Sequence, residues 1–338
     1  MIVIGIDLGT SNSAACIWRD SESLLIPNRM GEMLTPSVVS IENNHVVVGK
    51  RARERLITHP SVTIGAFKRL MGTDHTVALD KRHVFTATEL SAIVLRSIKE
   101  DAEAFLGEPV DHAVLSVPAY FNETQRQATR LAGELAGLTV NRLINEPTAA
   151  ALSYELHDRP EGTFMILDLG GGTFDVSVIE YFDGIMEVHA SGGDNHLGGE
   201  DFVEVLRAAF LKDHGLDWDQ LAPAEKQLLH NRMESAKRSI GPNAPFDTTL
   251  MLAGEDRSWH IDYAQMERLS APLLLRIQGP IRQVLYDAGR GIEQIDDVVL
   301  VGGATRMHMF RSMVSKTFRR MPKIDRDPDL AIAMGAGV

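Results

Sequence analysis

Two matched turns in this sequence carry residue types that could hold a phosphate group. Ile4 to Ile17 reads IGIDLGTSNSAACI, and Met165 to Ile179 reads MILDLGGGTFDVSVI. Each copy has an apolar strand ending in Asp, then Leu-Gly, a short turn of small residues, and a second apolar strand. Glycine in such a turn lets backbone N–H groups approach an anion with no Cβ in the way. The two copies therefore predict a pair of phosphate-binding β-hairpins.

An aspartate stands beside each of these turns. In the internal alignment Asp7 pairs with Asp168, and Gly9 pairs with Gly170. Two carboxylates that face a triphosphate need a cation between them, and Mg²⁺ held largely through water suits that arrangement. The turns offer amides and hydroxyls from Thr10, Ser11, Asn12, Gly171, Gly172 and Thr173. One such turn would more often be only a tight hairpin, whereas two matched turns favour phosphate binding.

A third glycine pair has the form of a nucleotide-facing turn. Gly302 and Gly303 follow an apolar strand and precede a helix, and bare glycine backbone can pack close to a sugar or a base. Strand–Gly-Gly–helix turns are common in α/β folds, so this pair alone is a weak signal.

The composition limits the class of protein. Among 338 residues the apolar fraction is 44%, which allows a sizeable core, and the net charge of −12 disfavours general binding to nucleic acid. The lone cysteine, Cys16, lies in an apolar strand and is expected to be a core residue. No apolar run approaches the length needed to cross a membrane, and the N-terminus lacks the features of a signal peptide. We therefore expect a soluble, cytoplasmic protein.

Strands alternate with helices along the chain, which predicts an α/β architecture. Asn122 is an expected helix N-cap with Gln125 three residues on, and Pro147 is expected at the first position of the next helix. A further helix is predicted between residues 269 and 288, with Pro272 and Pro280 breaking or bending it.

Six motifs together resemble one known family. They are GIDLGTSNS (Gly5 to Ser13), SVPAYFNETQRQAT (Ser116 to Thr129), LINEPTAAAL (Leu143 to Leu152), LDLGGGTFDVSV (Leu167 to Val178), GGDNHLGGEDF (Gly192 to Phe202) and VLVGGATR (Val299 to Arg306). In this order the sequence resembles the seventy-kilodalton heat-shock chaperones of the DnaK type. The phrases FKRLMG and LRSIKEDAEAFLG, with the short region from Phe246 to Tyr263, look most like the HscC branch.

The resemblance implies an actin-like ATPase fold of two lobes, each a twisted mixed sheet flanked by helices, with nucleotide in the cleft between them. Residues 1–157 would form the first lobe, with 37–86 as its outer subdomain. Residues 158–323 would form the second, with 198–270 as its outer subdomain, and residues 324–338 would return to the first. No β-rich substrate domain is present up to Val338, so we expect an isolated ATPase domain whose native chain continues further.

The resemblance also assigns site residues. Asp7 and Asp168 match the magnesium-site aspartates, which act mostly through water. Lys68 matches the lysine that reaches the γ-phosphate and the attacking water, and Glu146, Asp168, Thr173 and Asp175 complete the catalytic set. The nucleotide would contact Gly9, Thr10, Ser11, Asn12, Gly170, Gly171, Gly172, Thr173, Gly199, Glu200, Glu234, Lys237, Arg238, Gly302, Gly303, Arg306 and Asp329. ATP or ADP and Mg²⁺ are the expected cofactors, with K⁺ as a further candidate.

Pro118, Arg126 and Arg142 match the family's surface for signalling between lobes and for docking a J-domain co-chaperone. Three departures stand out: Ser11 replaces a common threonine, and Gly241 and Ala304 replace serines around the adenine pocket. The shortened second lobe makes the usual exchange factors doubtful partners, and a monomer is expected.

On this basis the expected function is slow, Mg-dependent ATP hydrolysis as the switch of a chaperone. A small-molecule kinase and an actin-like filament ATPase on the same scaffold are alternatives, as is a pseudo-ATPase that binds nucleotide only to hold its shape. Lys68, Glu146, Asp168, Thr173 and Asp175 are all present, which argues against the last.

Overall fold

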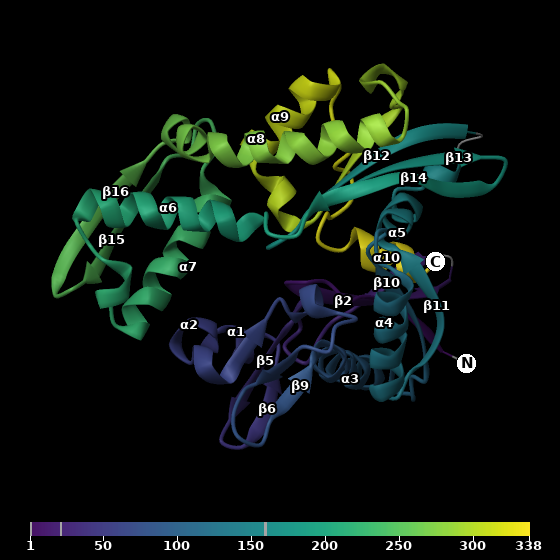
Figure 1. The fold of residues 1–338 in the computed structure, drawn as a ribbon, viewed down its shortest axis with the longest axis horizontal. Helices are drawn as coiled ribbons and strands as arrows, with labels where there is room; N and C mark the ends of the chain where they lie inside the picture. Colours follow the sequence, from purple (N-terminus) through teal and green to yellow (C-terminus); the bar gives the residue numbers. More distant parts are fainter. Residues whose placement is uncertain (1, 21, 159–160) are drawn as a thin grey trace.

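The structure is a computed structural model that describes residues 2–20, 22–158 and 161–338. Its two largest sheets are each covered by helices and lie in two halves, with α5 and α10 where the halves meet (Figure 1). The first residue of the expected first lobe, and residues 159–160 at the start of the expected second lobe, fall outside the described part of the chain. A mixed α/β fold, as predicted, is confirmed.

The first sheet has the order β11-β10-β1-β2-β3, with β4 paired to β2. Its strands are β1 (Val3–Asp7), β2 (Asn12–Arg19), β3 (Glu22–Ile26), β4 (Thr35–Pro36), β10 (His112–Val117) and β11 (Thr139–Asn145). β1 and β2 are antiparallel, as the first Asp-Leu-Gly turn predicts, while β1 and β10 are parallel. The helices α3 (Ala87–Leu106) and α4 (Glu123–Leu135) pack on this half.

The second sheet repeats this plan in the order β14-β13-β12-β17. Its strands are β12 (Glu161–Leu169), β13 (Phe174–Phe182), β14 (Ile185–Asp194) and β17 (Asp297–Val301). β12 and β13 form the second predicted hairpin, and β12 pairs in parallel with β17 as β1 does with β10. The internal repeat seen in the sequence is thus a repeat of sheet topology.

Smaller elements extend each half outward. The first half carries β5 (Val38–Glu42), β6 (His45–Val48), α1 (Lys50–Arg53), α2 (Arg55–Thr58), η1 (Pro60–Val62), β7 (Thr63–Gly65), η2 (Phe67–Leu70), β8 (Thr76–Ala78) and β9 (Val84–Thr86). The second carries α6 (Gly199–His214), η4 (Trp218–Gln220), α7 (Pro223–Ser239), β15 (Phe246–Leu252), β16 (Glu255–Ile261), α8 (Tyr263–Asp287), η5 (Ile292–Gln294), η6 (Gly303–Arg306) and α9 (His308–Phe318).

Helix starts follow local sequence signals closely. Asn122 and Gln125 form the predicted capping box of α4. The helix α5 (Glu146–Ser153) begins one residue earlier than predicted, so Pro147 is its second residue. Glu146 is therefore the first helical residue, where a carboxylate benefits from the helix dipole.

Of the two prolines predicted to break or bend the helix before residue 288, neither breaks it. The helix α8 continues from Tyr263 to Asp287 with Pro272 and Pro280 inside it. Proline lacks an N–H group, so Pro272 leaves the carbonyl oxygen of Arg268, one turn earlier, without its helical partner. Both residues are exposed, so water can bond that oxygen instead. Buried Met266, Ile277 and other side chains hold the helix against the core, which overrides the local penalty.

The two halves meet around α5 and the C-terminal helix α10 (Ala331–Ala336). Side chains of both helices join those of β12, β13 and β17 in one apolar cluster, which includes Ala150, Ile166 and Ile332. The short η3 (Leu156–Asp158) follows α5. The helices among the described residues are all too short or too polar to span a bilayer.

A small residue is required where α10 approaches α5. A Cβ placed on Gly335 would lie 1.7 Å from the carbonyl oxygen of Ala149. Gly335→Ala should therefore lower the free energy of unfolding by about 2–4 kcal/mol, measured by urea denaturation.

Gly279 in α8 is the matched control, because a Cβ there meets nothing within 4 Å. Gly279→Ala should leave stability unchanged or raise it by up to about 1 kcal/mol through helix propensity. Equal effects of the two substitutions would contradict the proposed close packing.

Candidate functional site

The two Asp-Leu-Gly turns face each other across the junction of the halves. A Cβ on Gly171 would lie 2.5 Å from the Oγ atom of Ser11, so the second turn touches the first. A Cβ on Gly9 would lie 2.0 Å from the carbonyl oxygen of its own turn, which explains why glycine is needed there. The two glycine-rich turns, residues 9–12 and 170–173, are thus brought together, as a shared anion site requires.

Four carboxylates and one lysine gather beside these turns. Asp7 ends β1, Asp168 lies near the end of β12, Asp175 lies near the start of β13, and Glu146 begins α5. Lys68, from η2, is buried and donates to Glu146 Oε1 at 2.7 Å. The predicted catalytic carboxylates and the predicted lysine therefore occupy one site.

Burial and mutual repulsion perturb these carboxylates. Burial, followed by the charge of Glu146, raises the pKa of Asp7 to about 6 and that of Asp175 to about 7. Burial and the neighbouring carboxylates raise the pKa of Asp168 well above its ordinary value. Burial works against the charged form of Lys68, but Glu146 and Asp7 outweigh it and raise its pKa. One ammonium group does not balance four carboxylates.

This excess of negative charge fits a divalent cation. The Oδ1 atom of Asp175 is buried and accepts no hydrogen bond from any residue that the structure describes. Within the same residues, no three His, Cys, Asp or Glu side chains converge closely enough to hold a metal by themselves. Oxygen ligands spaced in this way suit Mg²⁺, which keeps several waters and uses substrate phosphates as ligands.

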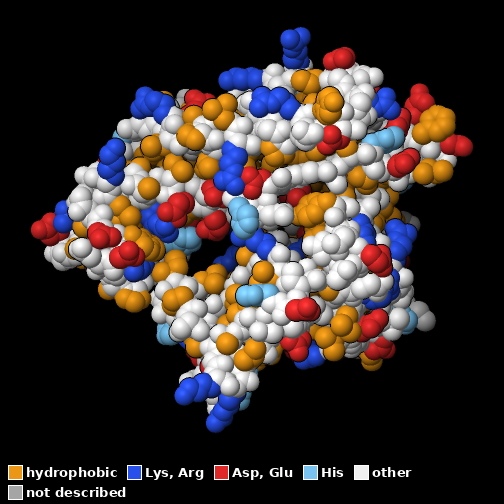
Figure 2. All heavy atoms as spheres, in the orientation of Figure 1, with side chains coloured by type: hydrophobic (Ala, Val, Ile, Leu, Met, Phe, Trp, Pro, Cys, Tyr) orange, Lys and Arg blue, Asp and Glu red, His pale blue; other side chains and the backbone are white. Residues whose placement is uncertain are grey.

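A small cavity that opens to solvent adjoins the carboxylates. Asp168, Asp175 and Glu146 line one part of it, while Pro118, Ile166 and Val301 make the rest apolar. Its walls come from both halves, and Figure 2 shows the molecular surface hollowed between them. The geometry provides a polar end for charged groups and a closed apolar wall behind them.

The start of α6 is fastened to the second turn. The N–H groups of Gly199 and Glu200 donate to the carbonyl oxygens of Gly170 and Gly171, at 2.9 and 2.8 Å. The ammonium of Lys237 donates to the Gly199 carbonyl oxygen at 3.2 Å. The predicted contact residues of α6 and α7 are thus connected to the turn that would hold phosphate.

The remaining predicted nucleotide contacts form two separate ion-pair groups. On α7, Glu234 bonds both Lys237 and Arg238 at 2.6 Å. After β17, Arg306 pairs with Asp329 at 3.3 Å. Among the ion pairs of the described residues, none joins the α7 group to the group after β17. Gly302 and Gly303 are needed as glycines, because a Cβ on either would lie 2.4–2.6 Å from neighbouring backbone or carboxylate atoms.

Three further residues belong to the site although the sequence reasoning did not identify them. Ser116 donates to Asp7 Oδ1 at 2.6 Å, and Arg69 donates to the Gly172 carbonyl oxygen. Ser116 begins the motif SVPAYFNETQRQAT, and Arg69 directly follows Lys68 in FKRLMG. Their place in these motifs was the only indication of a role that the sequence offered. Arg53 donates to the Ser11 carbonyl oxygen at 2.8 Å and carried no signal within its charged run.

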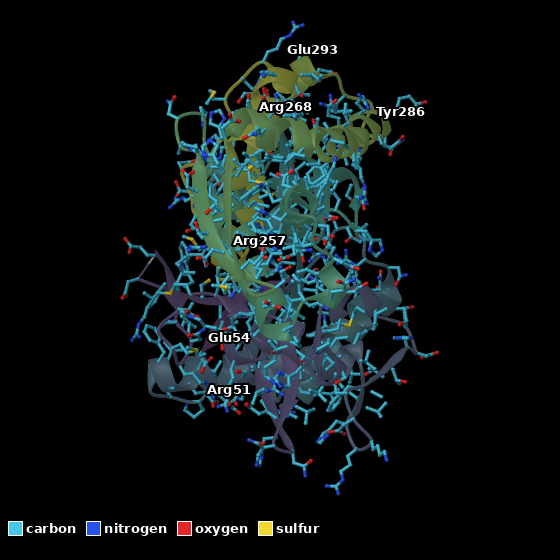
Figure 3. All side chains as sticks on the ribbon, turned by 90° about the vertical axis from the view of Figure 1, so that its left-hand side faces the viewer. Arg51, Glu54, Arg257, Arg268, Tyr286 and Glu293 are labelled. Carbon is cyan, nitrogen blue, oxygen red and sulfur yellow. The ribbon has the colours of Figure 1, made fainter. Side chains whose placement is uncertain are left out.

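Arg53 is also near enough to the second half for carboxylates there to affect its charge. It lies in α1, between Arg51 and Glu54, and Figure 3 shows these two below Arg257 of β16. Burial lowers the pKa of Arg53, and the carboxylates of Glu200 and Glu234 on the second half oppose that change. The charge of Arg53 in the first half is therefore attracted to Glu200 and Glu234 in the second.

The three residues expected at a docking surface lie near one another in the first half. Arg126 donates to Asn145 Oδ1 at 2.8 Å and to the carbonyl oxygens of Ala119 and Phe121. Pro118 is buried, whereas Arg142 is exposed on β11. Arg126 thus braces the loop after β10, and Arg142 is free to meet a partner.

The raised carboxylate pKa values predict how stability depends on pH without Mg²⁺. Asp7 and Asp175 bind protons in the folded state between about pH 4 and pH 7, where the unfolded chain releases them. Their contribution to the free energy of unfolding must therefore fall as pH rises through this window. Asp175→Asn should flatten that fall in urea titrations, while Asp256→Asn, at an exposed site, should keep the parental slope. A parental slope in Asp175→Asn would contradict the assignment.

One comparison with known families bears on this site. The family model described as Hsp70 protein matches residues 3–84 and 74–338, which together span nearly the whole chain. Members of that family are ATPases whose nucleotide-binding domains bind ATP or ADP with Mg²⁺. The matched turns, the buried lysine and the carboxylates described above all lie inside the matched ranges. This chain therefore belongs to the Hsp70 family of chaperones, of which it forms a nucleotide-binding domain.

Proposed function

We propose that this chain binds Mg-ATP between its two halves and hydrolyses it slowly, as the switch of a DnaK-type chaperone. The observation that carries the proposal is the buried pair of Lys68 and Glu146 among three further carboxylates. A lysine held in that place has a positive charge and an N–H group ready for a phosphate oxygen or a water. Phosphoryl transfer needs such positioning and charge neutralisation more than it needs covalent help.

Each residue of the site has a proposed role in this reaction. Lys68 would orient the γ-phosphate and the attacking water, with Glu146 fixing its ammonium group. Asp175 and Asp168 would accept hydrogen bonds from water, and Thr173 would bond phosphate from the second turn. Bound Mg²⁺ would neutralise phosphate charge, with Asp7 and Asp168 holding it mostly through water. K⁺ is a further proposed ligand of the phosphate end.

The base and ribose would lie between the two ion-pair groups. Glu234, Lys237 and Arg238 of α7 would form one wall, and Gly302, Gly303, Arg306 and Asp329 the other. Gly199 stands between them, since a Cβ there would lie 3.1 Å from Lys237 Nζ and 3.2 Å from the Cβ of Ala304. Gly241 and Ala304 supply no hydroxyl, so we expect the backbone and the charged side chains to provide most of the recognition.

The finer features of the proposal rest on the family resemblance. We assign the chain to the HscC branch and place it in the cytoplasm as a monomer. A J-domain protein would dock near Arg126 and Arg142, and clients would be bound only through a separate substrate domain. Residues 1–157 with 324–338 would move as one lobe against residues 158–323, so that the nucleotide state sets the angle between them.

The apolar part of the cavity favours an ATPase over a small-molecule kinase. A kinase would need a second pocket with polar anchors for its acceptor, whereas Pro118, Ile166 and Val301 make much of this cavity's lining apolar. A filament-forming ATPase remains the alternative that size-exclusion chromatography with and without Mg-ATP would reveal.

Single-turnover hydrolysis of radiolabelled ATP tests the proposed function. The parent should cleave ATP slowly and only with Mg²⁺, and Lys68→Ala should slow cleavage by about a hundredfold or more while still binding ATP. Lys81→Ala removes an exposed lysine and should behave as the parent does. ATP that binds tightly but is never cleaved by the parent would refute the enzymatic role and leave a nucleotide sensor.

A further inference from the structure

Tyr120 reaches across from the first half to the second, where its hydroxyl lies near both Asn195 and Asp175. Tyr120, in the loop after β10, donates its hydroxyl to Asn195 Oδ1 at 3.0 Å. Asn195 lies in the turn between β14 and α6, in the other half of the molecule. Neither residue is among the predicted nucleotide contacts, yet Tyr120 lines the cavity together with Asp168 and Asp175. The bond therefore crosses between the halves beside these carboxylates.

An arginine braces the tyrosine side of this bond. Arg126 donates to the backbone carbonyls of Ala119 and Phe121, on either side of Tyr120. The ring of Tyr120 packs edge-on against that of Phe121, whose face lies 5.8 Å from the Lys68 ammonium. Burial, and next the charge of Asp175, raises the pKa of Tyr120, so its hydroxyl keeps its proton at neutral pH. The Tyr120 hydroxyl is thus held in place, and it remains protonated and able to donate a hydrogen bond.

A second arginine braces the asparagine side. Arg276 of α8 donates from Nε and Nη2 to the two carboxylate oxygens of Asp194, at 2.7 and 2.9 Å. The same guanidinium donates to the His196 carbonyl oxygen at 3.1 Å. Bidentate pairs of this kind fix geometry as well as adding energy. Arg276 therefore holds the residues on both sides of Asn195.

The braced turn continues directly into the phosphate-binding elements. Gly198 follows it and packs against the second turn, since a Cβ there would lie 2.5 Å from Gly172. Gly199 then bonds the carbonyl oxygen of Gly170. Motion of the 194–198 turn must consequently move the second phosphate turn, and the Tyr120–Asn195 bond restrains that motion from the opposite half.

We propose that the Tyr120–Asn195 hydrogen bond is a clasp that holds the halves closed over bound ADP, with Arg276 as the positioning residue for Asn195. The proposal rests on nucleotide binding between the halves, as proposed above. Breaking the clasp should accelerate the release of ADP, and Asn195→Ala does so while leaving Tyr120 beside Asp175. A hydrogen bond of ordinary net strength corresponds to about a three- to tenfold change in that rate.

A double-mutant cycle on the ADP dissociation rate tests the clasp. ADP carrying an N-methylanthraniloyl label is displaced by excess ADP from the parent, Tyr120→Phe, Asn195→Ala and the double variant. Each single variant should release it about three- to tenfold faster, and the double variant no faster than the singles. Tyr286→Phe removes an exposed hydroxyl and should match the parent. Unchanged rates, or single effects that multiply in the double variant, would overturn the clasp.

The positioning role of Arg276 needs its own comparison. Arg276→Gln should accelerate ADP release in the parent background and have no further effect in Asn195→Ala. An equal acceleration in both backgrounds would show that Arg276 acts independently of Asn195 and would overturn its assigned role.

A measurement without nucleotide separates failure of the clasp from failure of the proposed function. Spin labels on Glu54→Cys and Asp256→Cys, exposed positions in opposite halves, report the distance between them, and the buried Cys16 stays unlabelled. Tyr120→Phe should shift the distance distribution toward longer values relative to the parent. An identical distribution would overturn the clasp, whereas a parent that binds no labelled ADP would overturn only the function.

Discussion

The structure depends on one electrostatic constraint, the gathering of four carboxylates around a single buried lysine where two sheets meet; Glu146 is buried and the three aspartates are half-buried. Like charges held this closely repel, and their pKa values rise because the protein alone does not neutralise them. Each carboxylate is held by a different rigid element, so the site cannot relax by moving one loop. A bound divalent cation can offset this excess of negative charge and the further negative charge that phosphates bring.

The two halves are suited to this task because each repeats the same strand plan. β1 and β12 both carry an aspartate to the same place, and the hairpins that follow bring two glycine turns face to face. Glycine is required where the second turn meets the first, at Gly171, and where α10 packs on α5, at Gly335. The second turn thus lies directly against the first, and the Tyr120–Asn195 hydrogen bond links the halves beside the carboxylates.

The sequence predicted those features that depend on neighbouring residues. The hairpins followed from Gly-rich turns between apolar strands, and the α4 capping box from Asn122 and Gln125. The α8 prolines do not break that helix, because the burial of one helix face outweighs the local cost of a proline. The Tyr120–Asn195 and Arg53–Ser11 contacts join residues remote in sequence, and no local pattern indicates such pairs. The roles of Lys68 and Glu146 came from family resemblance, since a lone lysine is usually exposed.

The central claim is that the buried charge excess makes nucleotide binding depend on a divalent cation. Calorimetric titration of ADP into the protein, with Mg²⁺ and then with a chelator, tests it most directly. The account predicts that removing Mg²⁺ weakens ADP binding by at least about tenfold, which corresponds to about 1.4 kcal/mol. Equal affinity with and without Mg²⁺ would show that the carboxylates tolerate the phosphates unaided and would contradict the account.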